Sequence, residues 1–217
     1  MNLSILEKIT LIALDDNTGI WVTDSMRLNY ALSCGILFEL YESGEIELNN
    51  GIIELTNSKN TKNLLLENTL ELLSNLKNKS LLSVVYKVAK LASRSKNEIL
   101  EGLVKKGILE TKEQNGNTIY PMIDGSYENA IKEELIEIAH KYKTIEDKDN
   151  LFLLKILANC KLQQEVFRNE MDTKKLVEIV EKAKISSNID NKTSQVVNQL
   201  EDTLNNLVVS ASTIKVY

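Results

Sequence analysis

The stretch Tyr30–Tyr41, YALSCGILFELY, limits what this chain can fold into more than any other segment. It is apolar on nearly every face, and only Ser33 and Glu39 interrupt it. A helix that is apolar all round is buried in a protein core or lies in a membrane, and this one is far shorter than the roughly 20 residues that span a bilayer. We therefore predict a central, buried helix, capped at its start by Asp24 or Ser25.

A β-hairpin is predicted directly after this helix. Gly44 provides a residue for the left-handed conformation that ends many helices. Residues 45–48 and 52–55 then read as short strands, and the Asn-Asn-Gly sequence at 49–51 is typical of a tight hairpin turn. A similar plan recurs at residues 95–122, where a helix and a glycine precede a second predicted hairpin with an Asn-Gly tip.

The remaining apolar patterns predict a mostly helical protein. The chain is 43% apolar but only 5% aromatic and holds a single proline, so its core is aliphatic and its helices are seldom broken. We predict one domain over residues 1–217, a mainly α helical bundle around buried apolar helices, with about ten helices and two β-hairpins. A short strand is expected at 20–22, and the further helices are expected at residues 3–14, 64–76, 81–92, 95–106, 127–142, 151–167, 173–183 and 196–211.

Composition narrows the function classes. The net charge of −5 argues against a dedicated nucleic-acid binder, which usually has a basic balance. Cys34 and Cys160 lie in apolar helical segments, so we expect reduced, buried thiols. Without a signal peptide or a membrane-spanning run we expect a cytoplasmic protein. No zinc-type Cys/His cluster or phosphate-binding glycine motif is present, so we expect no metal, no cofactor and no enzyme.

One basic segment, KVAKLASRSK at residues 87–96, is a candidate binding site. Lys87, Lys90 and Arg94 are spaced by three and four residues, which places them on one helical face. They predict a phosphate site, although a solvated basic face is the alternative interpretation.

A helix boundary is expected inside this basic segment. Ser95 with Glu98 fits a capping box, which predicts a break near residues 93–95 and a new helix start. The free N–H groups at a helix start attract anions, and Arg94 and Lys96 flank this one. The only tryptophan, Trp21, follows an exposed turn, where it is either an interfacial residue or a core or lid residue.

Five stretches resemble the Golgi phosphoprotein 3 family, and they occur in the family's order over nearly the whole chain. They are LSILEKITLIALDD, NYALSCGILFELYESGEIELNNG, LLLENTLELL, EGLVKKGILETKEQ and DNLFLLKILANC. The resemblance implies a helical fold with hairpins and a basic surface pocket. It also implies a peripheral membrane protein, because eukaryotic members read phosphatidylinositol 4-phosphate at the trans-Golgi and hold cytosolic tails of membrane enzymes.

The resemblance also implies the residues of that pocket, which eukaryotic members build from a tryptophan and three arginines. In YALSCG the first arginine position holds Ser33, and Arg27 lies one to two turns earlier. The paired arginine positions hold Ser93 and Lys96, and Trp21 lies about three residues upstream of the family's spacing. The predicted headgroup-binding residues are Trp21, Arg27, Lys90, Arg94 and Lys96.

The second hairpin departs from the family, because its tip, EQNGNT, is polar where eukaryotic members carry an apolar, membrane-contacting tip. We therefore predict a prokaryotic-type or divergent member that binds anionic phospholipid headgroups, with no nucleic acid as partner. Two alternatives stay open. The helix and hairpin at residues 95–122 also fit a winged-helix nucleic-acid binder, and the chain also fits a helical protein-interaction module without a lipid site.

Overall fold

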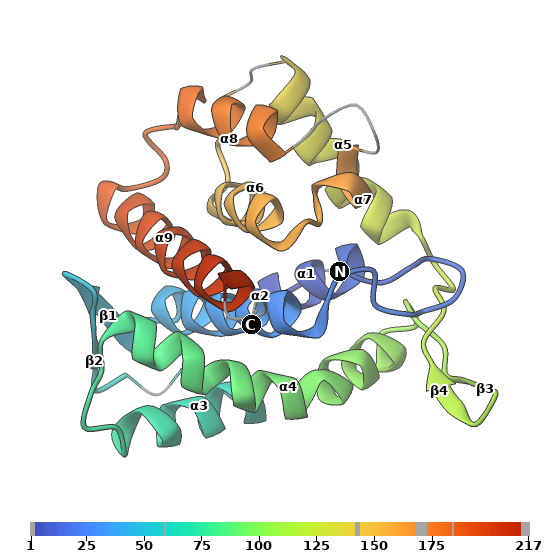
Figure 1. Ribbon diagram of the computed structural model, residues 1–217, viewed down its shortest axis with the longest axis horizontal. Helices are drawn as coiled ribbons and strands as arrows, with labels where there is room; N and C mark the ends of the chain where they lie inside the picture. The colour runs from blue at the N-terminus through green and yellow to red at the C-terminus, as the bar shows by residue number, and fades with distance from the viewer. Residues whose placement is uncertain (1–2, 59, 142–143, 168–172, 184, 214–217) are drawn as a thin grey trace.

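The computed structural model confirms a mainly α protein with two β-hairpins. It describes residues 3–58, 60–141, 144–167, 173–183 and 185–213. Within these ranges the chain forms nine helices and two separate antiparallel strand pairs (Figure 1). The helices are α1 (Ile5–Ile12), α2 (Ser25–Glu42), α3 (Leu64–Ser74), α4 (Leu81–Lys105), α5 (Ser126–Lys141), α6 (Lys148–Cys160), α7 (Gln163–Phe167), α8 (Thr173–Lys182) and α9 (Asn191–Thr213).

Helix α2 is the centre of the core, as its apolar sequence predicts. It packs against α1, α3, α4, α6 and α9, and it lies between α4 and the α6–α9 pair in Figure 1. Its residues 30–38 are all buried. The Asp24 side chain caps its start by accepting the backbone N–H of Arg27 at 3.0 Å. Gly44, just past its end, has the predicted left-handed conformation with φ of +74°.

Helices α1 and α2 approach closely because Gly35 has no side chain. A Cβ atom at Gly35 would lie 3.0 Å from Cδ1 of Ile9 and 3.1 Å from Cδ2 of Leu6. The Glu39 side chain, also on α2, accepts the backbone N–H of Leu6 at 2.9 Å. Burial raises the pKa of Glu39, while this hydrogen bond acts in the opposite direction. The Glu39 carboxylate of the central helix therefore satisfies a free N–H group at the start of α1.

Both predicted hairpins are present. In the first, β1 (Ile46–Asn49) pairs with β2 (Ile52–Leu55). In the second, β3 (Lys112–Gln114) pairs with β4 (Asn117–Ile119). In each turn an asparagine and a glycine both have positive φ, which is the geometry that an Asn-Gly sequence favours in a two-residue hairpin. The strand expected at residues 20–22 is only an isolated bridge between Trp21 and Leu14.

The predicted break near residues 93–95 is wrong, because α4 is one continuous helix of 25 residues. Ser95 is buried at 4% exposure in the middle of it and caps no helix start. The buried positions of α4 keep helical spacing without interruption from Val84 through Ala92 to Leu103. This continuous face packs on α2 and overrides the local capping pattern. The anion-attracting N–H groups expected at a helix start near Arg94 are therefore bonded within the helix.

A second helix boundary was missed in the C-terminal half. The predicted helix over residues 151–167 is two helices, because Lys161 takes the left-handed conformation with φ of +58° and ends α6. Cys34 and Cys160 are free and fully buried, as predicted. Among the described residues, no helix combines the length and the apolar character that a bilayer crossing requires.

Candidate functional site

An open groove of about 530 Å³ lies between the first turns of α2 and the middle of α4. Each wall comes from residues that recur at helical spacing on one face. The α2 wall consists of Ser25, Met26, Asn29 and Tyr30, and the α4 wall consists of Tyr86, Ala89, Lys90, Ser93 and Arg94. The groove thus brings together two predicted site residues, Lys90 and Arg94, with a set of apolar and hydroxyl side chains.

The two cations of this α2–α4 groove are exposed. The Nζ atom of Lys90 lies 4.7 Å from the centroid of the Tyr86 ring, which places its charge over the aromatic face. Among the described residues, neither Lys90 nor Arg94 has a carboxylate partner within ion-pair distance. Lys87, which the sequence places on the same face, does not line the groove. The groove therefore presents two uncompensated positive charges to an approaching anion.

Trp21 and Lys96 meet beside the groove. The Nζ atom of Lys96 lies 5.6 Å from the centroid of the Trp21 ring and donates to the hydroxyl of Ser25 at 3.2 Å. Since Ser25 also lines the groove, this pair adjoins the groove at the first turn of α2. Burial lowers the pKa of Lys96, as expected for an ammonium group that is partly shielded from water.

Arg27 and Ser33 lie apart from these groups. The Arg27 guanidinium is paired with Asp24 and is not part of the groove lining. Ser33, at the position where the family resemblance places an arginine, is fully buried and donates to the backbone oxygen of Val85 at 2.9 Å. Of the predicted site residues, the structure therefore gathers Lys90, Arg94, Lys96 and Trp21 in or beside the groove, and Arg27 does not line it.

The loop that carries Trp21 is fixed against the second hairpin and α5. The backbone oxygen of Asp16 accepts the N–H of Met122 at 3.2 Å. Gly19 has φ of +62°, and a Cβ atom there would lie 2.2 Å from the carbonyl carbon of Tyr120. Only glycine fits such a close approach. The position of Trp21 thus depends on a contact with a segment about a hundred residues further along the chain.

Glu128 is a buried carboxyl group behind this loop. It is 1% exposed, is ion-paired with Lys132, and lies near Asp16. Burial raises the pKa of Glu128 to about 7, the Lys132 ammonium opposes this shift, and Asp16 adds to it. Because the folded-state pKa exceeds the unfolded value, the contribution of Glu128 to stability is complete below about pH 4.5 and is lost as the pH rises through 7.

We therefore expect the free energy of unfolding to be about 1–3 kcal/mol lower at pH 8 than at pH 5.5 through this group. Urea denaturation at both pH values measures the difference. Glu128→Gln should flatten the dependence, because the buried group no longer titrates. Glu133→Gln is the control, because Glu133 is exposed on the same helix. This variant should show the same pH dependence of the free energy of unfolding as the natural chain. An equal pH dependence in Glu128→Gln and the natural chain would contradict this assignment.

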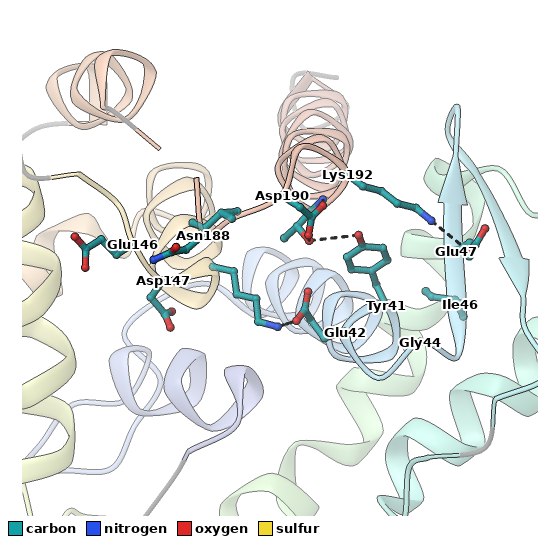
Figure 2. Close-up of a pocket in the computed structure, with 13 residues that line it drawn as sticks. Tyr41, Glu42, Gly44, Ile46, Glu47, Glu146, Asp147, Asn188, Asp190 and Lys192 are labelled. Atoms are coloured by element: carbon teal, nitrogen blue, oxygen red, sulfur yellow. Dashed lines mark hydrogen bonds and ion pairs between the residues drawn. The ribbon is translucent and has the colours of Figure 1, made fainter. Parts of the chain in front are cut away.

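A second hollow, of about 520 Å³, lies at the opposite end of α2. Figure 2 shows that its lining includes acidic side chains from α2, from β1 and from the segments just before α6 and α9. Its two lysines are both occupied, since Lys148 pairs with Glu42 and Lys192 pairs with Glu47. Five carboxylates against two lysines make this hollow unfavourable for an anion: Glu42, Glu47, Glu146, Asp147 and Asp190, with Lys148 and Lys192.

The α2 wall and the aromatic part of the groove were not predicted from the sequence. Tyr86 is spaced four residues before Lys90 and eight before Arg94, so the helical spacing that selected the cations also selects this tyrosine. No comparable signal marks Met26 or Asn29. They reach the groove because α2 packs along α4, and this contact is not encoded in the spacing of either helix.

The fold and the groove define a class of protein, a mainly α bundle with two hairpins and a small basic groove on its surface. A family model described as Golgi phosphoprotein 3 (GPP34) matches residues 5–204 of the chain. The chain therefore belongs to this family. A comparison with individually curated proteins found no match.

Proposed function

We propose that this protein is a peripheral membrane protein that binds anionic phospholipid headgroups in the α2–α4 groove. The observation that carries the proposal is the pair of exposed, uncompensated cations, Lys90 and Arg94, in a groove on a protein whose net charge is −5. Lys96 and Trp21 adjoin the same turn of α2. A tryptophan beside basic side chains suits the membrane–water interface.

The family supports a more specific ligand. Because eukaryotic members read phosphatidylinositol 4-phosphate, we propose this lipid as the preferred ligand and other anionic phospholipids as weaker ones. We also propose a binding and adaptor role rather than an enzymatic one, with the cytosolic tails of membrane proteins as further partners.

Liposome flotation tests the proposal. Neutral vesicles, phosphatidylglycerol vesicles and vesicles with phosphatidylinositol 4-phosphate are compared at two salt concentrations, with duplex DNA as a competitor. Three basic side chains at about 1 kcal/mol each predict a preference for anionic over neutral vesicles on the order of 100-fold. Retention on the phosphoinositide vesicles at the higher salt would support headgroup recognition. Equal recovery with neutral and anionic vesicles would overturn the proposal.

A further inference from the structure

The α2–α4 groove is larger and more apolar than a phosphate group requires. Its volume of about 530 Å³ falls in the range of roughly 300–1,000 Å³ that is typical of sites for organic ligands. Tyr30 and Ala89 are buried at its base. Met26 and Tyr86 add apolar surface that is partly accessible to solvent. A headgroup bound only through its charges would leave this apolar surface in contact with water.

Two features of the groove indicate where the polar and apolar parts of a ligand would lie. Lys90 is held over the Tyr86 ring at 4.7 Å, so a positive charge stands at the edge of the apolar surface. On the opposite wall, Asn29 adds a polar amide side chain to the lining of the groove.

We propose that the groove holds a whole segment of an anionic phospholipid and not its headgroup alone. The phosphate lies at Lys90 and Arg94, and the glycerol with the first acyl methylenes covers Met26 and Tyr86. This inference rests on the proposed function and narrows it, because the lipid must be drawn partly out of the bilayer to fill the groove.

Isothermal titration tests the inference with two soluble compounds. One is dioctanoyl phosphatidylinositol 4-phosphate below its micelle concentration, and the other is its deacylated glycerol derivative, which has the same headgroup. We expect the acylated compound to bind at least about tenfold more tightly, which is the effect of burying about two methylenes. Tyr86→Ala should reduce this difference to threefold or less. Leu82→Ala is the matched control, because Leu82 is 50% exposed one turn earlier on α4 and does not line the groove.

Different results would overturn the acyl-segment inference and the proposed lipid-binding function. Vesicle binding without a preference for the acylated compound overturns the inference and leaves headgroup binding in place. A tenfold preference that persists in Tyr86→Ala overturns the placement of the acyl segment in this groove. No binding to vesicles of any composition overturns the proposed function, and the inference with it.

Discussion

Charge reversal at Lys90 and Arg94 should release the protein from anionic vesicles. Each substitution to glutamate removes one attraction and adds one repulsion, so the pair should weaken binding by about 4 kcal/mol, or roughly 1,000-fold. Both side chains are exposed on α4, so the helix should tolerate the change. Flotation with phosphatidylglycerol and phosphoinositide vesicles measures the loss, and circular dichroism checks that the helical content is unchanged.

The matched control for this variant is Lys87→Glu/Lys105→Glu. It makes the same change in net charge on the same helix, but neither lysine lines the groove. Long-range repulsion from the membrane is therefore equal in the two variants. If both double variants lose binding to the same extent, the effect is one of overall charge and the groove has no special role.

Truncation of the aromatic pair at the centre of the bundle should be the most destabilising core change. Phe38 of α2 and Phe152 of α6 are 1% and 0% exposed, and their rings stack with centroids 4.6 Å apart. Phe38→Ala or Phe152→Ala should lower the free energy of unfolding by about 3–5 kcal/mol, because each leaves a cavity that the surrounding aliphatic side chains fill only in part. Urea denaturation measures this loss.

The exposed position Leu82 provides the comparison for the core variants. Leu82→Ala should change the free energy of unfolding by no more than about 0.5 kcal/mol. A double variant of Phe38 and Phe152 should show coupling of about 0.5–1.5 kcal/mol between the two rings. A loss below 1 kcal/mol in Phe38→Ala would show that the α2–α6 contact does not hold the bundle together.

The parts of the fold that follow from local chemistry could be predicted from the sequence. The central helix follows from its uniformly apolar faces, and the two hairpin turns follow from Asn-Gly pairs that take positive φ readily. The helix boundaries were predicted less accurately than the helices and hairpins themselves. Ser95 and Glu98 fit a capping box, but burial of the α4 face on both sides of Ser95 keeps the helix continuous. The end of α6 at Lys161 carries neither glycine nor proline to mark it.

Only the α4 wall of the groove could be predicted from the sequence. Helical spacing placed Lys90 and Arg94 on one face of a helix, because that relation is set by sequence separation alone. The opposite wall comes from α2, about sixty residues earlier in the chain. The pairing of Trp21 with Lys96 likewise depends on how the 15–24 loop packs on the second hairpin. Such relations arise from tertiary packing, and no local pattern contains them.

The continuity of α4 has a mechanical consequence. A helix of 25 residues is about 37 Å long, and in Figure 1 it extends from one hairpin to the other. Because the helix is continuous, the wall of the groove that it forms should keep its shape. The opposite side of the groove begins at Ser25, immediately after the loop that carries Trp21. An insertion or deletion in that loop would therefore move Trp21 relative to a wall of fixed shape, and would disturb the contacts of the loop with Tyr120 and Met122.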